Sequence, residues 1–197
     1  MIILFGLAGS GKGTQGKALS EIFGWRWLSV GDAIRQHGGY EDIINNGGLI
    51  PDEDVIKLMD KQIEKSEDEG FDVILDGYPR DKVQAEYIMD TMATKIDGAI
   101  ILEVPKEELY QRLALRGRDD DKERASIDKR FEIFEQNIYS ILPLLEAHNI
   151  PVERVDGVGK IEDVTARLVA VVKRLNSDAT EQNQDVNGGE IEKSYGE

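Results

Sequence analysis

The stretch FGLAGSGKGTQ, residues 5–15, decides which fold the rest of the chain must complete. From Gly6 to Lys12 it fits the phosphate-loop pattern G-x-x-x-x-G-K-[ST], but Gly13 stands where the pattern has a hydroxyl and Thr14 comes one place late. Closely spaced glycines let the backbone turn tightly and aim N–H groups at phosphate oxygens. An apolar run precedes the loop and helical spacing follows it, so we expect a strand, an anion-binding turn and a helix N-terminus. A glycine-rich turn with an incidental lysine is the alternative.

Composition limits the classes of protein that fit. The 197 residues are enough for one domain with a substantial core, and no apolar run is long enough to cross a bilayer. The N-terminus has no basic region before its apolar run, so we expect a cytoplasmic protein without a membrane partner. Zero cysteines exclude disulfides and a cysteine-based zinc site. The net charge of −15 argues against a nucleic-acid partner and makes any local cluster of arginines informative.

Strand-like and helix-like segments alternate along the chain. Near-continuous apolar strands separated by helical patterns predict an α/β fold with a parallel sheet covered on both faces. The expected strands are residues 1–6, 72–77 and 98–105, with a weaker one at 151–157, and the expected helices are 52–69, 81–92, 106–116, 123–148 and 160–175. From residue 176 to 197 the chain is polar and acidic, which predicts a disordered tail.

A second group of functional candidates follows the predicted strand 72–77, in LDGYPRDKVQAE. Asp76 would lie at the carboxyl end of a strand, where ligands gather, and could hold Mg²⁺ or its waters. Arg80 follows the turn and could bind a phosphate through two N–H groups. Gln84 carries both a donor and an acceptor and could read the edge of a base. A strand-ending turn whose arginine pairs with a surface acid is an equally good interpretation of this stretch alone.

A third group combines arginines with acids in LYQRLALRGRDDDKERASIDKRF. Arg112 and Arg116 are four residues apart on one face of a predicted helix, Arg118 follows Gly117, and Arg130 lies on the next helix. An exposed face with acid–arginine pairs is common and is the alternative. The acids 119–121 beside these arginines could also tether a small moving flap. Arg35, in SVGDAIRQ, is a further candidate for binding phosphate.

These stretches, taken in order, resemble the nucleoside monophosphate kinase family, and within it the short-lid adenylate kinases. GLAGSGKGTQ is similar to the family's G-x-P-G-x-G-K-G-T-Q loop, in which Gly-Thr follows the lysine. LSVGDAIR, GGLIPDEDV, LDGYPRDKVQAE, RLALRGRDDDKERASIDKRF and the late VDG resemble the further elements of the family from residue 1 to about 175. Each element is moderately specific, whereas the ordered set is highly specific.

The resemblance implies a P-loop three-layer sandwich with a five-stranded parallel sheet, and one kinase domain over residues 1–175. It implies a trimmed arm that binds the monophosphate (about residues 30–60, "the arm") and a short lid without zinc (about 117–124, "the lid"). It also implies a monomer that transfers a phosphoryl group reversibly from ATP, with Mg²⁺, to AMP while lid and arm close. The acceptor's phosphate oxygen is already ionised near neutral pH, so positioning and charge matter more than a general base.

The resemblance also assigns roles to residues. Those implied as catalytic are Lys12, Arg80, Arg116, Arg118 and Arg130. Those implied for ATP are Gly9, Ser10, Gly11, Lys12, Gly13, Thr14, Arg112, Arg116 and Gly159. Those implied for AMP are Val30, Arg35, Gly48, Leu49, Ile50, Gly77, Tyr78, Pro79, Arg80, Gln84, Arg118 and Arg130. Asp76 is implied to hold Mg²⁺ through water.

Departures from the family pattern leave the acceptor open. Ala8 replaces the usual proline, and Val30 replaces a threonine near the acceptor base, while the segment from Arg35 to Gly47 is shortened. UMP or CMP is therefore an alternative acceptor, although Gln84 favours AMP. A nucleotide-binding protein without turnover is the alternative from another class. Trp25 and Trp27 precede the SVGD stretch, and we interpret them as packing residues, with base stacking as the minor alternative.

Overall fold

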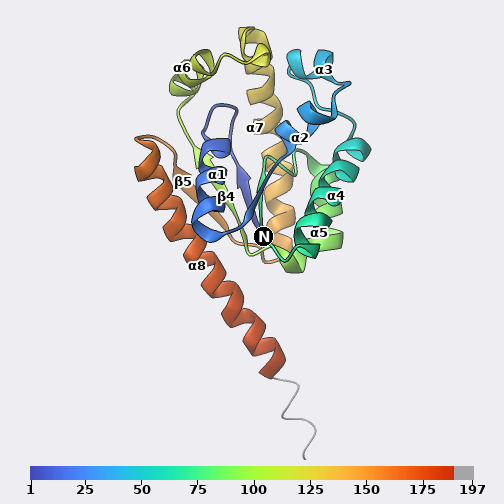
Figure 1. Cartoon of the computed structure of the whole chain (residues 1–197), viewed down its shortest axis with the longest axis vertical. Helices are drawn as coiled ribbons and strands as arrows, with labels where there is room; N and C mark the ends of the chain where they lie inside the picture. Colours follow the sequence, from blue (N-terminus) through green and yellow to red (C-terminus); the bar gives the residue numbers. More distant parts are fainter. Residues whose placement is uncertain (189–197) are drawn as a thin grey trace, which may run out of the picture.

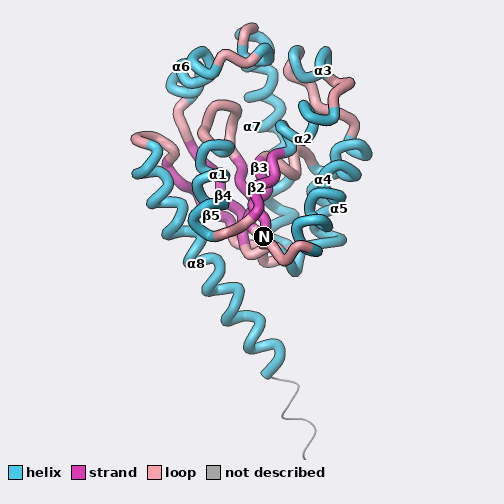
Figure 2. Tube along the Cα trace, viewed as in Figure 1, coloured by secondary structure: helices cyan, strands magenta, loops and turns pink. Residues whose placement is uncertain are grey.

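The computed structural model describes residues 1–188 and contains a five-stranded, all-parallel sheet in the order β2-β3-β1-β4-β5. The strands are β1 (Ile2–Phe5), β2 (Arg26–Ser29), β3 (Val73–Asp76), β4 (Gly98–Glu103) and β5 (Val152–Asp156). Figure 2 shows the strands in the centre with helices around them. The predicted fold class is confirmed, although β2 had not been recognised in the sequence. It is an edge strand whose four residues are only partly buried or exposed.

Alternating side chains of β1 divide the core into two layers. Ile3 and Phe5 face one large apolar cluster, whereas Ile2 and Leu4 face a second one on the opposite side of the sheet. All four are at least 98% buried, so both faces of this central strand are covered. This is the reason that MIILFG reads as a continuous apolar run and not as an alternating one.

The two faces carry different helices (Figure 1). The Ile2 face is covered by α1 (Lys12–Phe23) and by α8 (Ile161–Gly188), through residues such as Leu19 and Leu168. The Ile3 face is covered by α2 (Val30–His37), α4 (Asp52–Asp68), α5 (Lys82–Met92) and α7 (Arg124–Ala147). The remaining elements are α3 (Glu41–Asn45), η1 (Ala93–Lys95), α6 (Lys106–Arg116) and η2 (Asp119–Asp121).

Helix α8 is longer than the sequence predicted. We expected order to end near residue 175, but the helix continues to Gly188, and only the rest of the predicted tail lies outside the described residues. No glycine or proline occurs between Ile161 and Gly188, so nothing in the chain interrupts the helical hydrogen bonds once the first turns are packed on the sheet. Within the described residues, no helix is both long and apolar enough to cross a membrane.

A third, smaller apolar cluster lies between α6, α7 and the phosphate loop. Leu109 and Leu113 of α6 pack with Ile127 and Phe131 of α7, beside Leu7 and Ala8 of the phosphate loop. An added Cβ on Gly9 would lie 2.9 Å from Cγ of Leu113, so loop and helix are in direct contact. Helix α6 therefore packs against the phosphate loop and leads directly into the lid.

We predict that Leu113→Ala lowers the free energy of unfolding by about 2–5 kcal/mol, because it removes buried methyl groups and leaves a cavity in this cluster. Leu115→Ala on the same helix is the matched control, since Leu115 is 88% exposed, and it should change stability by no more than about 0.5 kcal/mol. Urea unfolding of the two variants measures the difference. Equal losses would contradict the packing described for α6.

Candidate active site

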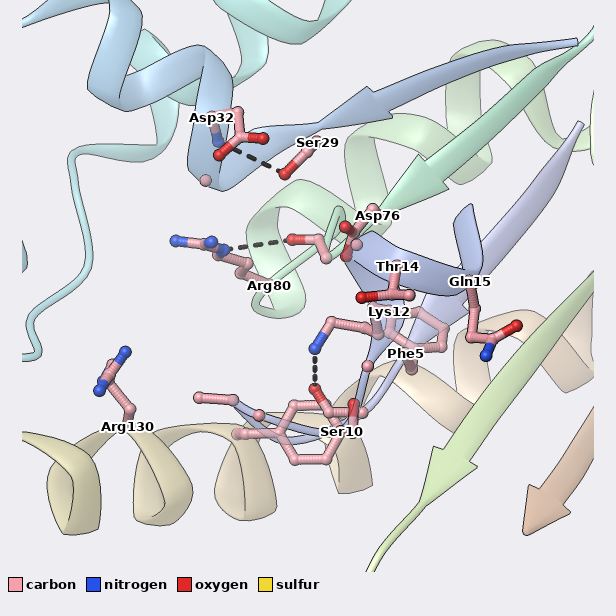
Figure 3. Close-up of a pocket in the computed structure, with 18 of the residues that line it drawn as sticks. Phe5, Ser10, Lys12, Thr14, Gln15, Ser29, Asp32, Asp76, Arg80 and Arg130 are labelled. Atoms are coloured by element: carbon pink, nitrogen blue, oxygen red, sulfur yellow. Dashed lines mark hydrogen bonds between the residues drawn. The ribbon is translucent and has the colours of Figure 1, made fainter. Parts of the chain in front are cut away.

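A cavity with a volume of about 740 Å³ opens at the carboxyl ends of β1 and β3. The connection from β1 leads across β3 to β2, whereas the connection from the neighbouring β3 leads across β1 to β4, so the chain leaves these two adjacent strands in opposite directions. Ligands of open α/β sheets bind at this kind of crossover point. Figure 3 shows Lys12, Asp76, Arg80 and Arg130, from four different elements, around this space.

The phosphate loop forms one wall of the cavity. Gly9 and Gly11 have φ angles of 84° and 100°, in the left-handed region that favours glycine. The first helical hydrogen bond of α1 runs from the Gln15 N–H to the Gly11 carbonyl, 2.9 Å long. The preceding N–H groups therefore have no partner within the helix and can bind an anion at the positive end of its dipole.

Lys12 folds back onto its own loop. Its Nζ donates hydrogen bonds to the carbonyl oxygens of Gly6 (2.5 Å) and Leu7 (3.1 Å). Removal from water, together with the nearby positive charges of Arg80, Arg116 and Arg130, lowers the pKa of Lys12 to about 8, although Asp76 opposes the shift. A negative ligand in the cavity would relieve this repulsion, so the lysine is prepared for an anion.

Asp76 lies at the end of β3 and is 7% exposed. Its Oδ2 accepts a hydrogen bond of 3.2 Å from Nε1 of Trp27, and burial raises the pKa of the carboxyl group. Within the described residues, no three acidic, histidine or cysteine side chains gather closely enough to hold a metal ion by themselves. A single carboxylate beside a phosphate loop fits Mg²⁺, which keeps several waters and is held largely by substrate phosphates.

Arg80 leaves the turn after β3 and lines the cavity. Its Nε donates to the Gly77 carbonyl (3.1 Å), and its own carbonyl accepts from Nδ2 of Asn137 on α7 (3.0 Å). Removal from water, together with the positive charges of Arg35 and Arg130, lowers the pKa of Arg80 to about 10. The negative charge of Asp76 opposes this shift. The backbone and side chain of Arg80 are thus both held in place, and the guanidinium remains charged at neutral pH.

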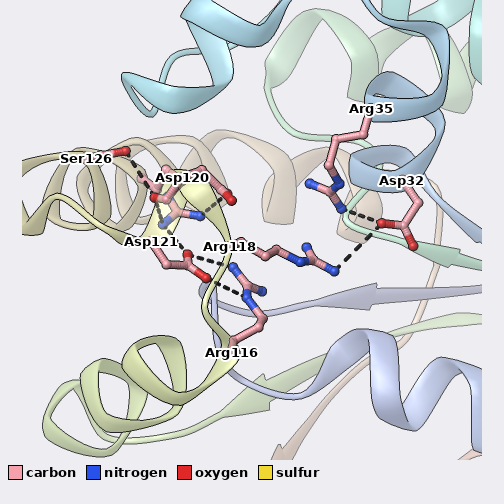
Figure 4. A network of polar contacts seen from close by, with 8 residues as sticks. Asp32, Arg35, Arg116, Arg118, Asp120, Asp121 and Ser126 are labelled. Atoms are coloured by element: carbon pink, nitrogen blue, oxygen red, sulfur yellow. Dashed lines mark hydrogen bonds and ion pairs between the residues drawn. The ribbon is translucent and has the colours of Figure 1, made fainter.

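Arg116 and Arg130, on either side of the lid, are paired with acids of the lid (Figure 4). Arg116 donates from Nε and Nη2 to the two carboxylate oxygens of Asp121, both at 2.7 Å. Arg130 donates to Asp120 Oδ2 at 2.7 Å and to Asp121 Oδ1 at 2.8 Å. Burial alone would raise the pKa of Asp121, but the hydrogen bonds from both arginines hold it below its ordinary value.

A further acid lies on the arm side of the cavity. Asp32, in the first turn of α2, accepts a hydrogen bond from Arg35 one turn later. Its carboxylate also lies 3.8 Å from Nη2 of Arg118 in the lid. Asp32 therefore connects the arm to the lid across the mouth of the cavity, as Figure 4 shows.

Arg112 joins the phosphate loop to the loop after β5. Its Nη1 donates to the Ser10 carbonyl (3.3 Å), and its Nη2 donates to the Gly157 carbonyl (3.0 Å) and to Glu108. The nearby Gly159 also lines the cavity. The flat guanidinium is thus held by three groups beside the phosphate loop.

Most of the predicted site residues meet at this cavity. Those that line it are Gly9, Ser10, Gly11, Lys12, Gly13, Thr14, Arg35, Gly48, Leu49, Ile50, Asp76, Gly77, Pro79, Arg80, Arg112, Arg116, Arg118, Arg130 and Gly159. Val30, Tyr78 and Gln84 do not. Val30 and Tyr78 are completely buried in the large apolar cluster, because the strand ends that precede them turn these side chains toward the core.

Gln84 is 1% exposed, and its amide is fully engaged. Its Nε2 donates to Asp52 (2.8 Å) and Asp81 (2.9 Å), and its Oε1 accepts from the Arg80 N–H (2.9 Å). In this conformation the Gln84 amide binds protein groups, and its role in reading a base stays a prediction. The acids at 52 and 81 compete for the same donor, and one of them, Asp81, is also the N-cap of α5.

Sequence reasoning did not single out several residues that belong to the site. Asp32 and Glu108 line the cavity and pair with Arg35 and Arg112, at spacings of three and four residues on their helices. Such spacings can be found in a sequence, but they are common on exposed helices. Trp27 also lines the cavity, although packing had been the preferred interpretation of its role.

Comparison with known proteins agrees with this geometry. A profile of the adenylate kinase family matches residues 4–150. The chain belongs to the adenylate kinase family. Adenylate kinases of Thermus thermophilus (32% identical, covering 87% of this chain and 96% of the relative), Sorangium cellulosum (33%; 90% and 98%) and Maricaulis maris (36%; 87% and 98%) are among its relatives. The prediction of a phosphotransferase enzyme of this family, made from the ordered motifs, is confirmed.

The lowered pKa of Lys12 predicts that the protein binds ATP less tightly as the pH rises through about 8. The lysine is charged below this pH and loses its proton above it, so affinity should fall by up to about tenfold per pH unit until the pKa of the bound state is reached. Calorimetric titration with metal-free ATP between about pH 7.5 and 9.5 measures this effect. Lys12→Met is the control, with weaker and nearly pH-independent binding. A parent profile as flat as that of Lys12→Met would contradict the assignment.

Proposed function

We propose that the protein catalyses the reversible, Mg²⁺-dependent transfer of a phosphoryl group from ATP to AMP, giving two ADP. The observation that carries this proposal is that one cavity receives cations from two opposite walls. Lys12 comes from the phosphate loop, Arg35 and Arg80 come from the other wall, and the lid arginines lie between. Two polyanions that meet end to end need this distribution of charge.

The donor half would comprise the loop from Gly9 to Thr14 together with Arg112 and Gly159. Backbone N–H groups at the start of α1 would hold the β- and γ-phosphates, and Lys12 would follow the phosphoryl group during transfer. Arg112 would stack on the donor base, and the loop at Gly159 would lie beside it. The three hydrogen bonds that hold Arg112 support this role, because they keep its plane fixed before a ligand arrives.

The acceptor half would comprise the arm residues Gly48, Leu49 and Ile50, with Arg35 and Arg80. The arginines would bind the monophosphate, and the short apolar stretch would pack against its base and ribose. Two of these groups, Arg80 and Ile50, are fixed by the core or by backbone hydrogen bonds, which favours a preorganised phosphate position.

Transfer itself would need little proton chemistry. The attacking group is a phosphate oxygen that is already ionised, so Arg116, Arg118 and Arg130 would act by stabilising charge as it spreads over the transferring group. Mg²⁺, held through water by Asp76 and directly by phosphates, would neutralise negative charge at the donor. Lid and arm would close over the ligands and exclude water, which protects ATP from hydrolysis. Action as a monomer in the cytoplasm stays a prediction.

Val30 and Gln84, which were predicted to contact the acceptor base, do not line the cavity. Val30 is buried and the Gln84 amide is engaged, so neither reads a base in this conformation. UMP or CMP therefore stays the second candidate acceptor. An assay coupled to diphosphate formation, with Mg²⁺-ATP and AMP, UMP, CMP, GMP or dTMP in turn, separates the possibilities. UDP or CDP formation far above ADP formation would overturn AMP as acceptor, and no diphosphate from any acceptor would indicate a binding protein without turnover.

We predict that Arg80→Ala lowers kcat by about 10³-fold or more while the protein stays folded, as expected for a removed phosphate-clamping arginine. Arg154→Ala is the matched control, because Arg154 lies on β5, is more than half exposed and pairs with Glu103 away from the cavity. Steady-state kinetics and a thermal unfolding scan of both variants check the prediction. Turnover within tenfold of the parent would contradict the role of Arg80.

A further inference from the structure

Trp27 lies beside Asp76 because of the register of the sheet. On the neighbouring strands β2 and β3, Trp27 pairs with Ile74 and Ser29 pairs with Asp76, so Trp27 and Asp76 are diagonal neighbours on the same face. Diagonal pairs are within reach of a large aromatic side chain. The indole Nε1 donates to Asp76 Oδ2 at 3.2 Å, and the ring forms part of the cavity wall.

Helix α1 holds the indole ring from the other side. An added Cβ on Gly16 would lie 2.3 Å from Cδ1 of Trp27, so the helix backbone rests directly against the ring. A Cβ on Gly13 would lie 3.5 Å from Cζ2 of Trp27 and 3.7 Å from Oδ2 of Asp76. The Nζ of Lys17 is 4.8 Å from the ring centroid. The indole is thus clamped, and its N–H points at the carboxylate beside the phosphate loop.

The chemistry of the indole limits what this contact can do. An indole N–H donates and does not accept, so it can hold one oxygen of an ionised carboxylate but cannot replace it as a metal ligand. Packing alone would be satisfied by any large aromatic ring, and only the N–H requires that the ring be turned toward Asp76.

We propose that Trp27 is a positioning residue for the magnesium–nucleotide complex, holding the Asp76 carboxylate in the orientation that accepts hydrogen bonds from the metal's waters. The inference rests on the proposed function, which assigns this role to Asp76. Trp27 would act through Asp76 and not touch the reacting phosphate. Its ring, at the wall of the donor site, would also report on whether the metal is present.

Fluorescence tests this without turnover, since the chain has two tryptophans. Trp25 stacks on Phe23 with ring centroids 4.9 Å apart and does not line the cavity, so Trp25→Phe leaves Trp27 as the reporter and Trp27→Phe leaves Trp25. Each variant is saturated with a non-hydrolysable ATP analogue and titrated with Mg²⁺. We expect the emission of Trp27 to change with Mg²⁺ and that of Trp25 to stay constant. A Trp27 emission that responds to the analogue but not to Mg²⁺ would overturn the proposal.

Kinetics provide the second test. Trp27→Phe should raise the Mg²⁺ concentration for half-maximal rate by about tenfold, the size expected for losing one hydrogen bond to a buried charge, and leave the acceptor KM unchanged. Trp25→Phe should match the parent. Asp76→Asn combined with Trp27→Phe should be no worse than Asp76→Asn alone. An unchanged Mg²⁺ requirement in Trp27→Phe, or additive losses in the double variant, would overturn the proposal.

The two hypotheses fail in different ways. If the parent forms no diphosphate from any acceptor, the proposed function fails, while the Mg²⁺ response of Trp27 emission still decides the positioning role. If Trp27→Phe does not fold, the Trp25→Phe titration decides it, because that variant keeps Trp27 and Asp76 intact.

Discussion

Repulsion between positive side chains in one cavity is the constraint on which the rest of the site depends. Lys12 and Arg80 both have lowered pKa values, first because they are removed from water and then because other cations lie close to them. A protein with a net charge of −15 has to concentrate these cations locally if it is to bind two nucleotides. Because these cations repel one another, acidic side chains must lie beside them before any ligand is bound.

Each wall of the cavity has acidic side chains beside its cations. Asp76 lies beside Lys12, Asp32 beside Arg35 and Arg118, and Asp121 binds both Arg116 and Arg130. The fork between Arg116 and Asp121 is the kind of pair that is strong in a partly buried place. These acids keep the arginines ordered without filling the space where phosphates would lie. Closing the lid on two nucleotides would then exchange carboxylate partners for phosphate partners, so the net change in pairing is small.

Sequence reasoning found the features that follow from local rules. The phosphate loop, four of the five strands and the helices from residue 52 onward were predicted to within about two residues, apart from the end of α8, because their apolar periodicity and bounding glycines and prolines are strong signals. Strand β2 was missed because an edge strand with the sequence RWLS carries no buried run. Helices α2 and α3 were missed because they are short, because α2 contains Gly31, and because glycines at 38, 39, 47 and 48 lie beside them.

The site was predicted where a motif fixes the backbone and was less complete where tertiary partners decide. Lys12 and Arg80 belong to rigid turns, so their motifs were sufficient to bring them to the cavity. Gln84 has an amide that suits a base edge equally well, but the neighbouring Asp81 and the distant Asp52 accept its hydrogen bonds in this conformation. A sequence pattern names the groups that a side chain can bind, and it does not say which of them will be within reach.

The position of Gln84 connects acceptor recognition to the arm. Its Nε2 joins Asp52, at the first residue of α4 where the arm returns to the body, to Asp81 at the start of α5. Removal from water and the hydrogen bond with Asp52 raise the pKa of Asp81 to about 6, and the two neighbouring carboxyl groups share the neutral amide of Gln84 as a donor. Turning the amide toward a base would leave both acids without this donor, at a cost of about 1–3 kcal/mol for each group left unpaired. An acceptor base must therefore either supply a replacement for this donor or be recognised by the backbone of Gly48 to Ile50, so selectivity depends on how firmly Gln84 ties the arm to the body.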